Sequence, residues 1–302
     1  MDNWIYWLHT LVIATWTVLM TIILGFFATT SAFFSKTGDT PHKVAQAWAR
    51  QLLWIGGISV TIRGLENLTP GRSYIYMANH QSNYDIPVLL GRLPAQFRWL
   101  AKAELFKIPV FGQSMRGCGY ISIDRSNRKK AFASLAEAAE TIRSGTSVMI
   151  FPEGTRSDDG RIKGFKKGGF VLSVDAGVPI VPIILTGTFD IMPKGRLMVR
   201  SRPVTMTICP PIETADYTRK TKDQLIEKVR TTMMTQFEEA RAAGELMVEE
   251  LEGQGGLRVL RIPQPGEQLF IGHGRAPRGR QRRAARGGSC RETRPCRTGR
   301  PG

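Results

Sequence analysis

The N-terminal segment limits what this chain can fold into more than any other feature of the sequence. Between Asp2 and Lys36 lie 33 residues without a single Lys, Arg, Asp or Glu. As one helix this segment would be about 50 Å long, whereas the hydrocarbon core of a bilayer is about 30 Å thick. We therefore expect a hydrophobic helical membrane anchor, either a tilted span with an interfacial extension or a hairpin of shorter helices bent near Gly25. A buried helix of a soluble protein is the alternative. A cleaved signal peptide fits poorly because no basic region precedes the apolar run.

Charges on the two sides of this segment predict its orientation. Lys36, Lys43 and Arg50 follow it, whereas Asp2 is the charged residue before it. Because positively charged flanks stay in the cytoplasm, the rest of the chain should lie on the cytoplasmic face of the cell (inner) membrane. The Thr-Pro pair at 40–41 is typical of a helix start. We therefore assign 1–56 to a membrane anchor and a juxtamembrane helix.

The central part of the chain, 57–252, alternates short apolar runs with helical patterns. The clearest helix is expected at 129–143, and a longer one after Thr221, where apolar residues recur every four positions. Strands that alternate with helices are typical of an α/β fold with a largely parallel sheet flanked by helices. The expected strands lie at 60–62, 74–78, 98–100, 120–123, 148–151, 180–185 and 204–208.

The last 50 residues, 253–302, differ sharply from the rest in composition. They contain 12 Arg against 2 Glu, no Lys and 11 Gly, in a chain with a net charge of +17. Such a segment cannot bury enough apolar surface to offset the entropy of ordering it, so we expect a disordered, basic Arg/Gly-rich tail. The charge alone raises the hypothesis of a nucleic-acid-binding membrane protein. Phe270 is the tail's one aromatic residue, so it has no platform for stacking bases, and this disfavours nucleic acid as a partner.

Candidate catalytic residues stand where the second expected strand ends. His80 follows the strand at 74–78, and Asp85 comes five residues later. On a continuous helix the two side chains would point about 140° apart. They can meet only if a turn intervenes, and Gln-Ser-Asn at 81–83 favours a turn. Asp85 would then hold one ring nitrogen of His80 and leave the other as a base. The alternative is that His80 caps a helix.

A second candidate site follows the strand at 148–151. The sequence there reads Phe-Pro-Glu-Gly-Thr-Arg-Ser at 151–157. Guanidinium groups bind phosphate oxygens bidentately, and glycine lets a ligand approach the backbone, so Gly154, Thr155 and Arg156 are suited to hold a phosphate. A surface turn with a solvated charge pair is the alternative. Lys166 and Lys167 would add positive potential nearby.

Four blocks of this sequence, taken together and in this order, resemble a known family. They are the signature of the glycerophospholipid acyltransferases, and they are most like those of the PlsC-like 1-acyl-sn-glycerol-3-phosphate acyltransferases. The resemblance covers roughly 63–210, and the Arg-rich tail has no counterpart in it. The blocks are 79–85 (NHQSNYD), 102–125 (KAEL through IP and FG to IDR), 151–157 (FPEGTRS) and 178–183 (VPIVPI).

The resemblance implies an activity and a role for each block. The family transfers a fatty acyl group from acyl-CoA or acyl-carrier protein to the sn-2 hydroxyl of lysophosphatidic acid, which gives phosphatidic acid for phospholipid biosynthesis. His80 would be the general base and Asp85 would orient it, in an acyltransferase domain at 57–252. The block at 178–183 would shape the acyl site or form a buried strand. The residues implied to hold the glycerol phosphate are Glu153, Gly154, Thr155 and Arg156, with Lys102 and Arg125 adding charge.

Two further points follow from the residues outside these blocks. His80 is the one histidine of the central part, and the four cysteines are scattered, so we expect no metal site and no cofactor besides the acyl donor. A sibling acyltransferase that acts on another lysolipid, or on an acylated amino acid, would use the same His80 and Asp85 chemistry. The positive charges favour an acceptor with a free phosphate, and membrane lipids are the expected surroundings.

Overall fold

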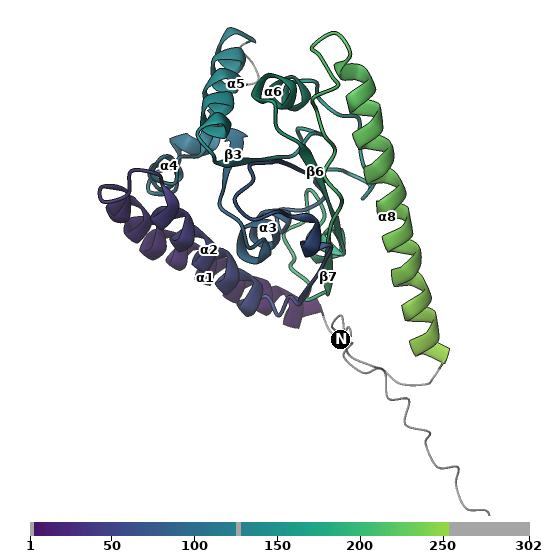
Figure 1. The fold of residues 1–302 in the computed structure, drawn as a ribbon. Helices are drawn as coiled ribbons and strands as arrows, with labels where there is room; N and C mark the ends of the chain where they lie inside the picture. Colours follow the sequence, from purple (N-terminus) through teal and green to yellow (C-terminus); the bar gives the residue numbers. More distant parts are fainter. Residues whose placement is uncertain (1–2, 125–127, 254–302) are drawn as a thin grey trace, which may run out of the picture. The chain divides into compact units, whose positions relative to one another are not determined.

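The computed structural model describes residues 3–124 and 128–253 (Figure 1). The predicted tail at 253–302 lies outside the described residues except for its first residue. The helices are α1 (Asn3–Ala32), α2 (Asp39–Ile55), α3 (Asp85–Arg92), α4 (Phe111–Gly117), α5 (Arg128–Arg143), α6 (Gly168–Ala176), α7 (Thr188–Ile191) and α8 (Lys222–Gly253), with 3-10 turns η1 (Leu65–Asn67) and η2 (Ala103–Lys107). The strands are β1 (Val60–Arg63), β2 (Ile75–Ala78), β3 (Phe97–Lys102), β4 (Ile121–Ile123), β5 (Ser147–Ile150), β6 (Ile180–Thr186) and β7 (Val204–Ile208).

The described strands form one seven-stranded sheet in the order β1-β7-β6-β2-β5-β3-β4. Neighbouring strands are parallel, except that β6 and β7 run antiparallel. The predicted α/β fold with a largely parallel sheet is therefore confirmed. Because β2, β5 and β6 run in the same direction, their carboxyl ends meet at one edge of the sheet, which is where ligands bind in open α/β folds.

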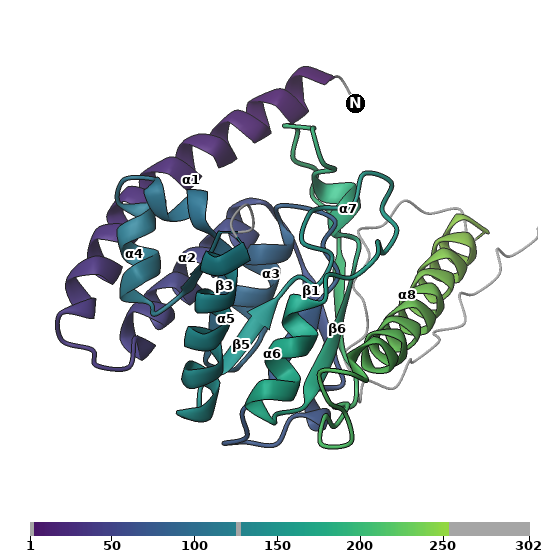
Figure 2. The same cartoon turned by 90° about the horizontal axis from the view of Figure 1, so that it is seen from above.

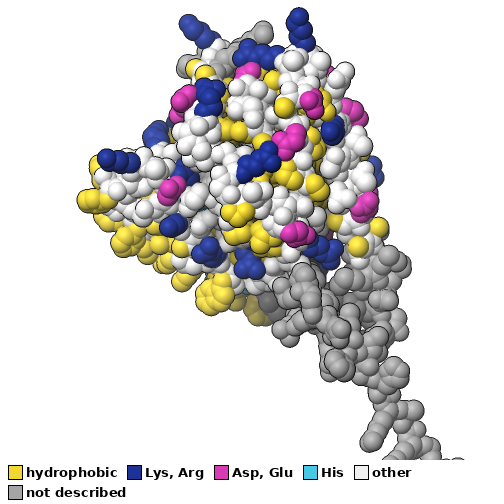
Figure 3. Space-filling model, in the orientation of Figure 1, with side chains coloured by type: hydrophobic (Ala, Val, Ile, Leu, Met, Phe, Trp, Pro, Cys, Tyr) yellow, Lys and Arg dark blue, Asp and Glu magenta, His cyan; other side chains and the backbone are white. Residues whose placement is uncertain are grey.

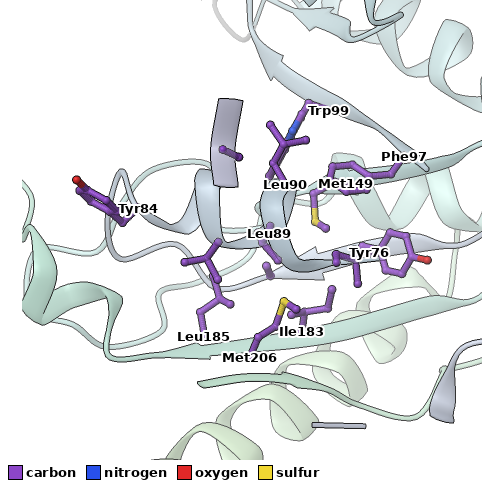
Figure 4. Close-up of a cluster of buried hydrophobic side chains, with 14 of the residues drawn as sticks. Tyr76, Tyr84, Leu89, Leu90, Phe97, Trp99, Met149, Ile183, Leu185 and Met206 are labelled. Carbon is purple, nitrogen blue, oxygen red and sulfur yellow. The ribbon is translucent and has the colours of Figure 1, made fainter. Parts of the chain in front are cut away.

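Helices cover both faces of the sheet, as Figure 2 shows from above. Alternate residues of β2 point to opposite faces, as the period of a strand requires. Tyr76 packs with Leu89 of α3 in one buried cluster, part of which is drawn in Figure 4. Ile75 and Met77 pack in the other, with Phe170 of α6 and the apolar stripe of α8. Burial on both faces explains why these strands are apolar throughout rather than alternating.

The N-terminal segment is one helix rather than a bent hairpin. α1 runs through Gly25 as 30 continuous residues, and its stretch Trp7–Ala32 is long and apolar enough to cross a membrane. It nevertheless lies against the domain: Trp48 Nε1 donates to Thr21 Oγ1 at 3.0 Å, and the Val199 amide donates to Thr10 Oγ1 at 3.0 Å.

The side of α1 that faces away from the domain is strongly apolar. Hydrophobic side chains gather in Figure 3 over the region where Figure 1 places α1 and α2. Large apolar residues recur at three- and four-residue spacing along the helix, so they share one face. The exposed ones are Trp4, Trp7, Leu8, Leu11, Val12, Val18, Leu19, Ile22, Ile23, Phe26 and Phe27. α1 is thus packed on one side and uncovered on the other.

Candidate active site

His80 and Asp85 lie together at the carboxyl edge of the sheet. Their side chains are joined by a hydrogen bond of 2.8 Å between His80 Nδ1 and Asp85 Oδ2. The turn at 81–84 makes this contact, because α3 begins only at Asp85 and the two residues are not on one helix. The sequence-based expectation that the two side chains meet across a turn therefore agrees with the geometry.

Asp85 is held rigidly and faces no solvent. Its side chain is fully buried, and Oδ2 also accepts hydrogen bonds from the amides of Gln81 at 2.6 Å and Ser82 at 2.9 Å. An ionised carboxylate can only accept, so Nδ1 of His80 must carry the proton that it donates. The neutral ring then has its lone pair on Nε2. The arrangement fixes both the orientation and the tautomer of His80.

The block at 151–157 holds His80 from a second side. The ring of Phe151 stacks on the imidazole, with centroids 3.9 Å apart and planes 10° apart. The His80 amide donates to Glu153 Oε1 at 2.8 Å, and the Ser157 amide donates to the His80 carbonyl at 2.8 Å. These contacts join segments about seventy residues apart in the sequence, and none of them was predicted. Contacts to its ring, its amide and its carbonyl therefore all fix the position of His80.

Glu153, one of the residues that the resemblance implied to hold the glycerol phosphate, contacts the backbone of His80 and Lys163. Its side chain is buried, with 2% of the residue exposed, and it is absent from the wall of the cavity described below. Oε1 accepts from the His80 amide, and Oε2 accepts from the Lys163 amide at 2.8 Å. Burial raises the pKa of this carboxyl to about 7, because the charged form loses its hydration. The two carboxylate oxygens of Glu153 therefore connect the backbone of His80 to the loop that contains Lys163.

A cavity of about 460 Å³ opens beside His80. Its polar wall contains Asn83, which no sequence argument singled out, together with four of the predicted phosphate-binding residues. Those four are Lys102, Gly154, Thr155 and Arg156. The backbone of Gly154 has φ of +75°, in the left-handed region where glycine is favoured. The structure therefore brings the predicted base and these polar residues to one cavity.

The rest of the cavity is apolar, and α1 forms part of it. Thr21, Leu24, Gly25 and Ala28 of α1 line the cavity, and α2 adds Val44, Ala45 and Trp48. The sequence predicted a membrane anchor here, with a buried helix as the alternative, and did not predict that the segment lines a cavity. A run without charged residues does not indicate which side of a helix faces a cavity. The one signal in the sequence is that Thr21, Gly25 and Ala28, on the side of α1 that lines the cavity, are small or carry a hydroxyl group. The apolar wall also includes Ile86, Leu90, Trp99, Leu105, Phe111 and Met115.

The remaining predicted residues are placed as follows. Lys102 is exposed and pairs with Glu104 at 3.3 Å. Arg125 lies outside the described residues. Lys167 pairs with Asp223 of α8 at 3.0 Å and is not part of the cavity wall. The block at 178–183 runs into β6, which is buried in the sheet, and none of its residues lines the cavity.

The histidine of α2 differs from His80 in its surroundings. His42 is fully buried, packs against Phe97, and its Nδ1 lies 3.0 Å from the hydroxyl of Tyr120. Burial and, secondarily, the nearby Arg98 guanidinium lower the pKa of His42 to about 3. It is neutral at physiological pH and does not line the cavity. Within 3–124 and 128–253, no group of three or more His, Cys, Asp or Glu side chains is arranged to hold a metal ion.

Comparisons with known proteins identify the family of this chain. A family model described as Acyltransferase matches residues 59–186. The 1-acyl-sn-glycerol-3-phosphate acyltransferase of Limnanthes douglasii is 40% identical over 179 residues, which cover 59% of this chain and 63% of that protein. The human 1-acyl-sn-glycerol-3-phosphate acyltransferase alpha is 32% identical over 215 residues, which cover 71% of this chain and 76% of that protein.

A solved structure shares the fold. The crystal structure of the 1-acyl-sn-glycerophosphate (LPA) acyltransferase PlsC from Thermotoga maritima superposes with a TM-score of 0.70 and 29% identity, covering 80% of this chain and 98% of that chain. The chain spans less than two thirds of the length of the plant relative above. The match to the human protein covers more than two thirds of both chains. The chain belongs to the acyltransferase family that contains the 1-acyl-sn-glycerol-3-phosphate acyltransferases.

Proposed function

We propose that this protein transfers a fatty acyl group from a thioester, acyl-CoA or acyl-carrier protein, to the sn-2 hydroxyl of 1-acyl-sn-glycerol-3-phosphate, giving phosphatidic acid. The observation that carries the proposal is His80, hydrogen-bonded to the buried Asp85, on the wall of a cavity whose polar part contains Arg156 and whose remainder is apolar. The relatives named 1-acyl-sn-glycerol-3-phosphate acyltransferase support the choice of acceptor.

In the proposed mechanism His80 acts as a general base. Nε2 takes the proton of the sn-2 hydroxyl while that oxygen attacks the thioester carbonyl and forms the new C–O bond. The C–S bond then breaks, and the thiolate leaves with the proton that the imidazolium returns. Asp85 stabilises the imidazolium and keeps the ring in place. The two substrates supply every reacting atom, so the reaction needs no metal and no cofactor.

The acceptor's phosphate is proposed to bind at Arg156, Gly154 and Thr155. A phosphomonoester carries between about −1.5 and −2 charges at neutral pH, so a second cation is needed to balance it. Lys102 lines the same cavity and supplies one. Arg125 remains a candidate for the same role from outside the described residues. We assign Glu153 to positioning His80 rather than to binding the acceptor.

The apolar part of the cavity is proposed to hold the acyl chain. Its wall contains residues of α1, so the anchor contributes to the substrate site as well as to membrane attachment. We propose that the uncovered apolar face of α1 is immersed in the cytoplasmic side of the cell membrane, with the domain at 57–252 in the cytoplasm. An acceptor that is itself a membrane lipid could then reach His80 without leaving the bilayer surface.

An acyl-transfer assay with several acceptors tests this proposal. Purified protein in mixed micelles is given one labelled acyl thioester and, separately, lysophosphatidate, lysophosphatidylcholine, lysophosphatidylethanolamine or an N-acyl amino acid. The proposal expects labelled phosphatidic acid and a much lower rate with the acceptors that lack a free phosphate. Preference for one of those acceptors would establish the sibling acyltransferase instead. No transfer to any of them by a folded protein would reject the proposed activity.

A further inference from the structure

The loop between β6 and β7 exposes an apolar side chain among basic ones. Residues 194–202 read Lys-Gly-Arg-Leu-Met-Val-Arg-Ser-Arg, with four cations and no acidic residue. Leu197 is 75% exposed, whereas the most exposed large apolar residues of α1 are 62% exposed. Arg196, Arg200 and Arg202 are exposed on either side of it. A single exposed leucine is common on protein surfaces, but one set among exposed arginines combines an apolar contact with positive charge, and this suggests a partner with an apolar part and negative charge.

Hydrogen bonds hold this loop in a defined shape. The Arg196 amide donates to the Pro193 carbonyl at 3.0 Å, and the Arg200 amide donates to the Ile191 carbonyl at 2.9 Å. Lys194 pairs with Asp158 at 2.6 Å. These contacts connect the loop to α7 and to Asp158, the residue after the 151–157 block. It presents Leu197 as a fixed feature of the surface.

The loop also contacts both α1 and the turn beside His80. Val199, which is 4% exposed, donates its amide to Thr10 Oγ1 of α1. The Ser82 hydroxyl donates to the Met192 carbonyl at 2.9 Å, just before the loop. In Figure 2 the loop rises from the sheet beyond α7 toward the N-terminal end of α1. The loop thus lies beside the packed side of α1, at the edge of the sheet that carries His80.

We propose that residues 194–202 form a second membrane contact, in which Leu197 enters the bilayer interface and Arg196, Arg200 and Arg202 bind the phosphates of anionic lipids. Two observations favour a lipid surface over a protein partner. The loop contacts α1, whose other side is apolar and exposed. The loop also carries four cations and no acidic residue, which suits an anionic leaflet. A single helix lying in the interface leaves the domain free to rotate about the helix axis. A second contact beside it fixes that rotation and holds the His80 edge at the bilayer.

The depth of single labelled positions tests the proposal. Cysteine is introduced as Leu197→Cys in a full-length chain that carries Cys290→Ser and Cys296→Ser, and it is labelled with a fluorescent maleimide. Cys118 and Cys209 are buried, and burial raises the pKa of their thiols to about 12 and about 11, so they react slowly. Val18→Cys on the uncovered face of α1 is the positive control. Leu65→Cys is the negative control, because Leu65 is exposed and far from the loop. It lies in η1, just after β1, and β1 runs opposite to β6, so η1 is at the other end of the strands from the carboxyl end of β6.

Each labelled protein is placed in phosphatidylcholine–phosphatidylglycerol vesicles that contain a lipid-attached quencher. The proposal expects quenching at positions 18 and 197 and none at 65, with aqueous iodide giving the reverse. Replacing the three arginines by glutamine should lower the partition of the label at 197 into the bilayer by about fivefold per arginine.

Three outcomes separate the possible failures. If the label at 18 is unquenched, the proposed membrane placement of α1 is itself wrong. If the label at 18 is quenched while the label at 197 behaves like the one at 65, α1 binds the membrane and the second contact does not exist. Quenching at 197 that is unchanged by the arginine substitutions, and equal in vesicles of phosphatidylcholine alone, would overturn the role of anionic headgroups.

Discussion

Substituting Glu153→Gln separates a residue that positions His80 from one that binds the acceptor. The carboxylate accepts two backbone hydrogen bonds of 2.8 Å, from the amides of His80 and Lys163. Glutamine has one acceptor oxygen, and its amide group would face one of these two N–H donors. Losing one hydrogen bond to a charged group costs about 1.5–3 kcal/mol. A protein with a typical stability of about 5–15 kcal/mol stays folded after that loss.

The kinetic effect of this substitution should appear in kcat. If the lost interaction displaces His80, about 1.5–3 kcal/mol corresponds to a fall in kcat of about 10- to 150-fold. The KM for lysophosphatidate should change little, because Glu153 does not line the cavity. Initial rates over a range of acceptor concentrations, at saturating thioester, measure both constants. A raised KM with an unchanged kcat would refute the positioning role and restore Glu153 as an acceptor ligand.

Stability as a function of pH gives a second readout of the same residue. Burial raises the pKa of Glu153 from 4.5 to about 7. The folded state therefore binds more protons than the unfolded state between pH 4.5 and about 7, and its stability falls as pH rises through that window. The interval corresponds to about 3 kcal/mol. Thermal unfolding in detergent from pH 4.5 to 8 should show the wild type losing about that much stability relative to Glu153→Gln. A pH-independent difference between the two proteins would contradict this.

Three other substitutions or truncations give separate predictions. Asp85→Asn should lower kcat by less than removing His80 does and shift its pH profile, because the ring loses the carboxylate that fixes its tautomer; equal losses would contradict an orienting role. Arg156→Ala should raise the KM for lysophosphatidate about 10- to 150-fold and leave the thioester KM unchanged, with partial rescue by Arg156→Lys and no effect from the surface control Arg143→Ala. If the thioester KM rises instead, Arg156 binds the donor. A chain that ends at Glu252 should keep full acyl transfer at low and high salt, since the tail's composition favours no packed structure; a salt-sensitive loss would show that it contributes to membrane binding.

The sequence predicted those parts of the fold that depend on local patterns. Apolar runs alternating with amphipathic stretches identified all seven described strands to within a few residues, since strand burial leaves a compositional signal. The His80–Asp85 contact was also predictable, because five-residue spacing requires a turn and 81–83 supplies turn-forming residues. The single helix at the N-terminus was one of two expected forms.

What the sequence could not predict depends on contacts between distant segments. Glu153 and His80 are 73 residues apart, and only the parallel pairing of β2 with β5 brings them together. The resemblance grouped Glu153 with the residues expected to hold a phosphate, whereas in the structure its side chain is buried and accepts hydrogen bonds from two backbone amides. The contribution of α1 to the cavity was missed for the same reason, since an apolar helix carries no signal of which side faces a substrate.

Acyl transfer by His80→Ala tests the central claim most directly. The variant is compared with the wild type in mixed micelles with lysophosphatidate and labelled thioester, after circular dichroism and thermal unfolding show that it is folded. A positioned general base contributes about 10²–10⁴-fold to the rate, and within the described residues His80 is the histidine that lines the cavity. We predict a loss of at least about 10²-fold in kcat with the KM for lysophosphatidate little changed. Turnover near the wild-type rate by the folded variant would contradict the mechanism.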